Sequence, residues 1–335
     1  MSKISIALCT YNGAKFLPAQ LESFLAQTRL PDELIVCDDC SIDETPQIVN
    51  DFARRSPFPV SFHVNEKNLG STKNFERAIS LCGGDLIFLS DQDDVWLSGK
   101  LARIQTEFDK SSQVGLVFSD AEIVDENLQP ANCSLWQFTF SEERREKSRN
   151  GNFFDVLLWQ NVVTGATMAF RSEYRKIFMP IPDHVPNLIH DSWISLLIAN
   201  EAEVVFVEEQ LIKYRQHSNQ QLGIDYKTAF KRSFAERKSR YAAGIEVGWQ
   251  EVERLEQMKE IFAAYPQFEK RRGSVSFNDL IEEKREQIAH YDARMNLPLN
   301  RFERFLPIFR ENFTGRYRRF SKGFLSVAKD LLEKW

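Results

Sequence analysis

The sequence lacks the features that would place a protein in a membrane or outside the cell. It contains no run of about 18 apolar residues, the length that a helix needs to span a bilayer. Its first residues carry one lysine and a short apolar stretch that Ser5 interrupts, which is too short and too polar for a signal peptide. We therefore expect a cytoplasmic protein.

The sequence also lacks an excess of basic residues and an even number of cysteines. The net charge is -5, whereas a general nucleic-acid-binding protein is usually basic, so we expect no nucleic-acid partner. The five cysteines are scattered and odd in number, which fits reduced thiols better than a disulfide framework. Cys37 and Cys40 form a C-x-x-C, but no further Cys or His cluster completes a zinc site. We interpret them as small residues at a strand end and its turn.

The chain of 335 residues is long enough for two domains, at about 150 residues each. In the first part, strand and helix patterns alternate, which predicts right-handed βαβ units and a mainly parallel sheet flanked by helices. After residue 225 strands disappear and charged and apolar residues recur at helical spacing. We predict an α/β domain over 1–225 and a helical C-terminal region over 226–335. The predicted strands are 4–8, 34–37, 60–64 and 86–89, and the predicted helices are 14–27, 43–55, 71–81, 226–265, 277–292 and 301–335. The polar segment 125–152 is expected to be a surface loop.

Polar residues follow three of the predicted strands at their carboxyl ends. Thr10, Tyr11 and Asn12 follow the first strand, Asp38 and Asp39 the second, and residues 90–94 the fourth. Each group alone is compatible with ordinary turn chemistry, because Asp and Asn favour turns and caps. Parallel sheets bind ligands at this edge, so the shared position predicts a binding crevice there.

The clearest indication of a metal site is a group of three carboxylates within four residues. Asp91, Asp93 and Asp94 repel one another unless a cation lies between them, and oxygen ligands suit Mg²⁺ or Mn²⁺. The alternative is a solvated acidic turn that caps the next helix. The sequence contains neither G-x-G-x-x-G nor G-x-x-x-x-G-K, so a bound diphosphate would depend on such a metal ion.

These motifs, taken in order, resemble those of family 2 inverting glycosyltransferases with the Rossmann-like GT-A fold. The resemblance covers about residues 3–220 and rests on four segments: Ser5 to Asn12, Ile35 to Asp43, Asn68 to Asn74 with Lys73, and Asp91 to Asp93. It implies that Thr10, Tyr11, Asn12, Asp39, Lys73 and Asp91 bind the nucleotide. It also implies that Asp93 is the main ligand of a Mn²⁺ or Mg²⁺ ion that bridges the donor diphosphate.

An inverting transfer needs a base that accepts the proton of the acceptor hydroxyl. The resemblance assigns this role to Asp191 and places His190 where the family often has a first acid. Asp191 also suits the N-cap of a helix, and both roles are compatible because a helix N-terminus stabilises a carboxylate. Gly165 to Thr167 lie where the family places small residues beneath the sugars; the alternative is a tightly packed strand start.

His217, in Tyr-Arg-Gln-His, is the second predicted metal ligand. A lone histidine is more often structural, but the resemblance implies that this one reaches the metal or the diphosphate, and neutral imidazole is a plausible ligand beside carboxylates. The D-Q-D-D-x-W and Y-R-Q-H-x-x-N patterns are similar to those of rhamnosyltransferase-like members. They imply a dTDP-rhamnose donor, or otherwise a UDP-sugar.

The predicted function is the transfer of a sugar to a hydroxyl of a glycan or lipid-linked acceptor in surface polysaccharide biosynthesis. The alternative is a non-catalytic nucleotide- or sugar-binding protein of the same fold. The last predicted helix is rich in basic and aromatic residues. It suits peripheral contact with an anionic inner membrane face, although packing on the catalytic domain with a solvated basic face explains the same pattern.

Overall fold

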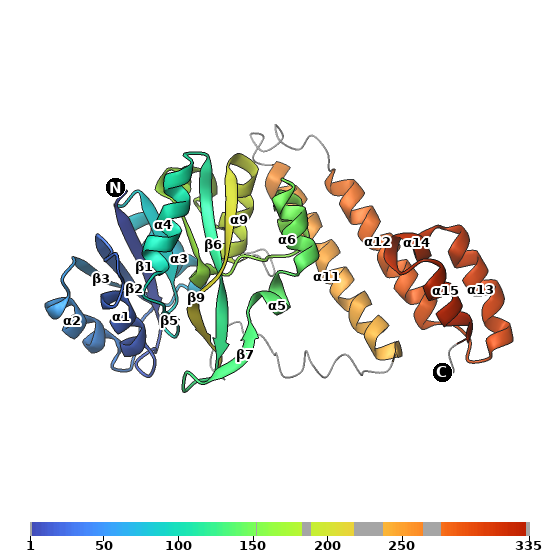
Figure 1. The fold of residues 1–335 in the computed structure, drawn as a ribbon, viewed down its shortest axis with the longest axis horizontal. Coiled ribbons are helices and arrows are strands. Elements are labelled where there is room, and N and C mark those ends of the chain that lie inside the picture. Colours follow the sequence, from blue (N-terminus) through green and yellow to red (C-terminus); the bar gives the residue numbers. More distant parts are fainter. Residues whose placement is uncertain (1, 152, 183–188, 218–236, 264–275, 333–335) are drawn as a thin grey trace. The chain divides into compact units, whose positions relative to one another are not determined.

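The computed structural model describes residues 2–151, 153–182, 189–217, 237–263 and 276–332 (Figure 1). The chain divides into two compact units, residues 1–224 and 225–335. The boundary predicted from the sequence, between residues 225 and 226, lies outside the described residues. The two units are considered separately below.

Unit 1 is built on a nine-stranded mixed sheet with helices packed against it (Figure 1). The strand order is β3-β2-β1-β4-β8-β6-β9-β5, and β7 pairs with β6. The strands are β1 (Ile4–Thr10), β2 (Glu33–Asp38), β3 (Val60–Val64), β4 (Leu86–Ser90), β5 (Val95–Trp96), β6 (Val114–Val124), β7 (Pro130–Ser134), β8 (Met168–Arg171) and β9 (Glu203–Arg215).

The helices of unit 1 connect these strands and cover the sheet. The α-helices are α1 (Leu17–Leu25), α2 (Thr45–Arg55), α3 (Ser71–Leu81), α4 (Lys100–Lys110), α5 (Trp136–Thr139), α6 (Glu142–Arg149), α7 (Phe153–Trp159), α8 (Arg175–Phe178) and α9 (His190–Glu201). Two short 3₁₀ turns, η1 (Gly165–Thr167) and η2 (Ser172–Tyr174), flank β8. The predicted strands and helices up to residue 90 are therefore confirmed, with ends that differ by a few residues.

The two halves of the sheet differ in strand direction. Strands β1, β2, β3 and β4 pair in parallel, as the βαβ pattern predicts. Strand β8 then inserts antiparallel between β4 and β6, and β5 pairs antiparallel with β9. In the parallel half, the two central strands β1 and β4 are mostly apolar and are buried along their full lengths. The sheet is thus more mixed than the sequence pattern indicated, because β8 and β5 are too short to show periodicity.

The segment 125–152, expected to be a surface loop, contains β7, α5 and α6, so that prediction was wrong. Its aromatic residues explain the difference. Trp136 and Phe140 are buried, and their rings contact Phe118 of β6 at centroid distances of 5.5 and 5.7 Å. Burial of such large rings stabilises the segment despite the charged stretch at 142–147.

Unit 2 is helical in its described residues, with α11 (Arg237–Ala263), α12 (Phe277–Met295), α13 (Arg301–Phe313), α14 (Arg316–Phe320) and α15 (Phe324–Leu332). The single helix predicted over 301–335 was wrong. The chain turns at Gly315 (φ +77°) and Gly323 (φ +53°), left-handed conformations that glycine adopts without a steric penalty. Pro307 lies inside α13. Within the described residues, no helix is long and apolar enough to cross a membrane.

Candidate active site

The carboxyl ends of β2, β1 and β4 meet at one edge of the sheet, because these strands are parallel neighbours. Hydrogen bonds connect the loops that follow them. The Gln92 amide accepts from the Tyr11 N–H at 2.8 Å and donates to the Tyr11 carbonyl at 2.9 Å. The Asn12 N–H donates to Ser41 Oγ at 2.8 Å, and Asn12 Oδ1 accepts from the Ile42 N–H at 2.9 Å. The structure thus brings the three predicted loops into one connected surface.

The predicted nucleotide-binding residues of the first loop differ in accessibility. Tyr11 is 51% exposed, and Asn12 is exposed and adopts a left-handed φ of +47°. Thr10 is buried and its hydroxyl donates to Asp38 Oδ1 at 2.8 Å. Tyr11 and Asn12 are therefore accessible at this edge, whereas Thr10 is buried and holds Asp38 in position.

The Asp39 carboxylate organises the loop at residues 65–70. Its Oδ1 accepts from Asn65 Nδ2 at 2.6 Å and from the Leu69 N–H at 2.7 Å, and its Oδ2 accepts from the Gly70 N–H at 2.9 Å. Asp39 is 3% exposed. It therefore fixes the backbone that leads into α3, the helix that carries Lys73.

Lys73 lies on the first turn of α3 and is partly buried. Its Nζ donates to Glu76 Oε2 at 2.9 Å and to the Ile181 carbonyl at 2.5 Å. Glu76 also accepts a bond from the Ile181 N–H. In this structure Lys73 therefore connects α3 to the segment after α8, and its charge is already paired.

The acidic loop after β4 concentrates negative charge with little compensation. Burial, together with the nearby Asp93 and Asp191 carboxylates, raises the pKa of Asp91 to about 7. Burial also raises the pKa of Asp94 well above its usual value, with Asp93 and Asp91 adding to the effect. Asp94 Oδ1 accepts from the Arg215 N–H at 3.0 Å, while its buried Oδ2 has no hydrogen-bond partner. Such a cluster favours a bound cation.

The two predicted metal ligands lie in contact. His217 Nε2 is 2.8 Å from Asp93 Oδ2, although the two residues are 124 positions apart in the sequence. His217 follows the end of β9, which pairs with β5 directly after the acidic loop. The described residues contain no group of three or more His, Cys, Asp or Glu side chains arranged for a metal ion. A carboxylate and an imidazole are suitable for Mn²⁺ or Mg²⁺ when diphosphate oxygens and water fill the other positions.

Lys100, which the sequence analysis did not single out, lies beneath the acidic loop. It is fully buried at the start of α4, and its Nζ donates to the Ala166 carbonyl at 2.5 Å. The same Nζ lies 3.7 Å from the centroid of the Trp96 ring. Burial lowers the pKa of Lys100, whereas Asp94 and Asp91 oppose that shift. Lys100 therefore joins the acidic loop to the turn η1, and only its burial distinguishes it from a surface lysine.

Asp191 lies in the first turn of α9 and is 5% exposed. Its Oδ1 accepts from Asn161 Nδ2 and its Oδ2 accepts from the Gly165 N–H, both at 2.9 Å. The small residues at 165–167 thus contribute a backbone donor to the predicted base. Asn161 was not identified from the sequence, because a single asparagine between a helix and a turn gives no signal.

His190, whose role the sequence left open, is a packing residue. It is buried, and its ring stacks on Phe75 at a centroid distance of 4.1 Å. Burial lowers its pKa to about 3, so the ring stays neutral at ordinary pH. Neither ring nitrogen has a hydrogen-bond partner. In this structure His190 is therefore a neutral ring that makes no hydrogen bond to the neighbouring Asp191.

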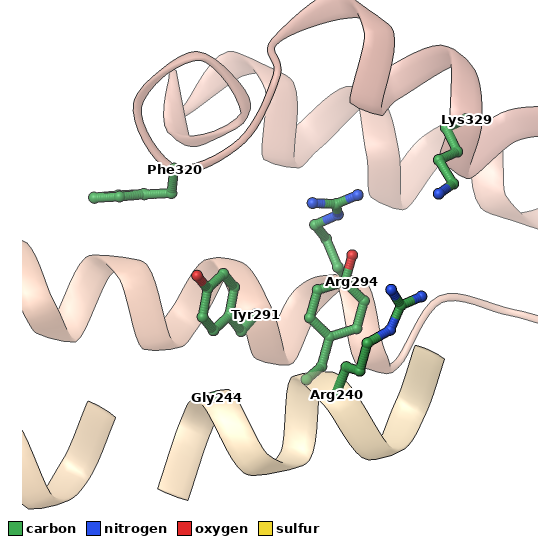
Figure 2. A pocket seen from close by; sticks show the side chains of 7 residues that line it. Arg240, Gly244, Tyr291, Arg294, Phe320 and Lys329 are labelled. Carbon is green, nitrogen blue, oxygen red and sulfur yellow. The ribbon is translucent and has the colours of Figure 1, made fainter. Parts of the chain in front are cut away.

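Unit 2 contains a cavity of about 380 Å³ (Figure 2). None of the predicted site residues lines it. Its lining combines basic and aromatic side chains: Arg240, Tyr241, Gly244, Tyr291, Arg294, Phe320 and Lys329. Arg294 is already paired within the unit, since its guanidinium donates to both oxygens of Asp330 at 2.7 and 2.9 Å.

Comparison with solved structures identifies the fold. The chain is similar to S. aureus TarS 1–349, solved in complex with UDP-GlcNAc, with a TM-score of 0.51 and 16% identity over 97% of this chain and 92% of that one. It is equally similar to the mannosyltransferase PcManGT from Pyrobaculum calidifontis, solved with GDP-Man and Mn²⁺, with a TM-score of 0.51 and 16% identity over 100% and 88%. The expected fold class, GT-A with a C-terminal helical region, is confirmed.

Comparison of sequences identifies the family. The dTDP-rhamnosyl transferase RfbG of Shigella flexneri is 25% identical over 237 residues, which cover 67% of this chain and 77% of RfbG. An uncharacterised protein of Mycobacterium tuberculosis is 26% identical over 220 residues, and this chain spans only 59% of that protein's length. Residues 5–178 match the model of the family described as Glycosyl transferase family 2. The chain therefore belongs to glycosyl transferase family 2.

Proposed function

We propose that this protein is a metal-dependent inverting glycosyltransferase that moves a sugar from a nucleotide-sugar donor to a hydroxyl of a glycan or lipid-linked acceptor. The contact between Asp93 and His217 carries the proposal, because it brings together a carboxylate and an imidazole, two side chains suited to binding a metal ion, at the edge where the loops after β1, β2 and β4 converge. Asp191 lies close enough to raise the pKa of Asp91, so the proposed base belongs to the same cluster.

Asp93 and His217 would hold a Mn²⁺ or Mg²⁺ ion together with the donor diphosphate. When bound, such an ion stabilises the negative charge that the departing nucleoside diphosphate gains, without requiring a proton. Arg215 helps to place both ligands: its Nε donates to the Asp93 carbonyl at 2.5 Å, and its guanidinium lies 4.7 Å from the centroid of the Phe16 ring, which also contacts the His217 ring.

Asp191 would accept the proton of the attacking hydroxyl. Two neutral donors, the Asn161 amide and the Gly165 N–H, hold its carboxylate in one orientation and favour its charged form. The N-terminus of α9 adds a favourable dipole. Attack from the side of Asp191, opposite the diphosphate, would invert the configuration of the sugar carbon.

The nucleotide would lie along the loops after β1, β2 and β4. Tyr11 and Asn12 are accessible for direct contact, and Asp91, directly after β4, is partly exposed where the ribose would bind. Thr10 and Asp39 would shape the base site through the loops that they fix. Lys73 would face the base or the phosphates after exchanging its contact with Glu76 for the ligand.

The donor and the biological setting are inferred from relatives. RfbG is named as a dTDP-rhamnosyl transferase, and TarS and PcManGT were solved with UDP-GlcNAc and GDP-Man. We infer a dTDP-sugar, with dTDP-rhamnose as the first candidate and a UDP-sugar as the second. The role would be surface polysaccharide assembly in the cytoplasm, at the inner membrane face if the acceptor is lipid-linked.

Calorimetric titration tests this proposal. The nucleotides dTDP, UDP, GDP and CMP would each be titrated into the protein with Mn²⁺ and again with EDTA. We expect binding of dTDP or UDP that requires Mn²⁺. Absence of binding by all four would contradict the proposal and favour a non-catalytic protein of this fold.

A further inference from the structure

Helix α13 buries charged side chains and exposes apolar ones, which is the opposite of the usual arrangement in a surface helix. It buries Arg304 and Glu311 beside Ile308, and it exposes its large apolar side chains. The exposed set is Phe302 at 92%, Phe305 at 64%, Leu306 at 56%, Phe309 at 49% and Phe313 at 75%. Isolated exposed apolar residues are normal on proteins, but a contiguous apolar surface indicates an interaction site.

These five residues form one continuous stripe, called here the aromatic face. At 3.6 residues per turn they fall within an arc of about 100° around the helix. Neighbouring rings are in contact: the centroids of Phe305 and Phe309 are 6.1 Å apart, and those of Phe309 and Phe313 are 4.6 Å apart. Helix α15, which packs against α13, also exposes Phe324 and Leu325.

The buried charges show that this orientation of α13 is fixed. The Arg304 guanidinium donates to the carbonyls of Pro298 at 2.6 Å, Leu299 at 2.8 Å and Asp330 at 3.1 Å. On the same side of the helix, Glu311 Oε1 lies 2.8 Å from His290 Nδ1. Rotating the helix to bury the phenylalanines would leave these charged groups without partners, at a high cost in free energy. The aromatic face therefore stays on the surface of unit 2.

The charge around the aromatic face is positive. Residues 301–332 contain eight lysine and arginine residues and three acidic ones, in a chain whose net charge is -5, and one of the eight, Arg304, is buried away from the aromatic face. Two of the three acids, Glu311 and Asp330, are buried and paired. By helical geometry Arg301 and Arg310 flank the aromatic face on opposite sides, where long basic side chains can reach lipid phosphates while the rings enter the acyl boundary.

We propose that the aromatic face of α13 binds the surface of an anionic phospholipid membrane, with Arg301 and Arg310 contacting the headgroups. Charge complementarity favours this partner over a second copy of the chain. A symmetric dimer through this face would bring the basic residues that flank it on both copies into one interface, and like charges repel. An anionic bilayer instead attracts each nearby basic residue.

Vesicle flotation of the full chain tests this proposal. Vesicles of phosphatidylcholine alone would be compared with vesicles of phosphatidylcholine and phosphatidylglycerol, at low and high salt. We expect binding to the anionic vesicles that weakens at high salt. The double variant Phe305→Ser with Phe309→Ser should lower the partition coefficient by at least about tenfold, because two apolar side chains no longer enter the bilayer. Arg301→Gln with Arg310→Gln should remove most of the salt dependence.

A matched control replaces two exposed apolar residues of unit 1, Val64→Ser with Leu81→Ser, and should leave vesicle binding unchanged. Light scattering without lipid checks the alternative partner. A dimer that Phe305→Ser with Phe309→Ser dissociates would overturn the proposal, as would absence of vesicle binding or binding that this variant retains. The experiment needs neither donor nor acceptor, so its failure would leave the proposed transferase function untouched.

Discussion

The side-chain amide of Asn161 donates a 2.9 Å hydrogen bond to Asp191, and the Gly165 N–H donates a second bond of equal length to the other carboxylate oxygen. Both donors are uncharged, so they orient the carboxylate and leave it able to accept a proton. Because the two bonds come from outside α9, they couple the proposed base to the turn before β8.

The first prediction concerns this base. Asp191→Asn removes the proton acceptor and should lower the transfer rate by at least about 100-fold, while nucleotide affinity stays unchanged. Asn161→Ala should lower kcat and leave donor KM unchanged, because it only loosens the orientation of Asp191. The measurement is initial-rate kinetics with a dTDP- or UDP-sugar. Asn200→Ala, at the other end of α9, is the control, and wild-type rates in Asp191→Asn would exclude a base role.

The second prediction concerns the Asp93–His217 pair. Asp93→Ala and His217→Ala should each weaken Mn²⁺-dependent nucleotide binding by at least about tenfold, because each removes a ligand of the bound ion. The double variant should lose little more nucleotide affinity than the more strongly impaired single variant. In each single variant the remaining ligand alone already holds the ion poorly. Calorimetry with Mn²⁺ and with EDTA measures both effects. His63→Ala on β3 is the control, and equal affinities with Mn²⁺ and EDTA in the wild type would refute the metal site.

The third prediction concerns the buried cation beneath the acidic loop. Lys100→Met should lower the free energy of unfolding by about 3 kcal/mol, because it removes the Lys100 charge that acts on buried Asp94 and leaves the Ala166 carbonyl without its donor. Urea denaturation measures the change. Lys110→Met, at the exposed end of the same helix, should change stability by no more than about 0.5 kcal/mol. Similar stability of the two variants would show that Lys100 has no such role.

The fourth prediction concerns pH. The pKa of His190 is about 3 in the folded protein against 6.5 for an ordinary histidine, so between these values the unfolded chain binds a proton that the folded chain does not. The stabilisation is fully present above pH 6.5 and falls as the pH is lowered, at a rate of about 1.4 kcal/mol per pH unit. From pH 7 to pH 5 this contribution amounts to about 2 kcal/mol.

His190→Leu should flatten the dependence of unfolding free energy on pH over this range, whatever its effect on stability at pH 7. Leu81→Ser, which removes no titratable group, should leave the slope as in the wild type. Urea denaturation at pH 7, 6 and 5 gives the slopes. Equal slopes in the wild type and His190→Leu would show that His190 is already accessible to protons in the folded state.

The parallel half of the sheet could be predicted from the sequence because its strands are apolar runs with helical stretches between them. The same pattern located the three loops, since each begins where an apolar strand ends. Strands β5 and β8 escaped prediction because two and four residues are too few to show a period. The helix break at Gly315 was missed because a glycine is also tolerated inside a helical pattern, at a modest cost.

Other features could not be predicted because they depend on contacts between segments that are distant in the sequence. Lys100 resembles any lysine at a helix start, and only the tertiary structure buries it beside Trp96. Asn161 became significant through its distance to Asp191. In α13 the aromatic residues were visible in the sequence, but their exposure depends on partners elsewhere in the chain, such as His290 and Asp330, that hold the charged side inward.

The contact between Asp93 and His217 also has a consequence for the order of biosynthesis. Asp93 leaves the ribosome early, together with the loops after β1, β2 and β4, whereas His217 follows β9 and emerges 124 residues later. During that interval the nascent chain has these three loops but only one member of the pair. A premature product that ends before β9 would have the same defect. Completion of the pair therefore has to await synthesis of nearly all of unit 1.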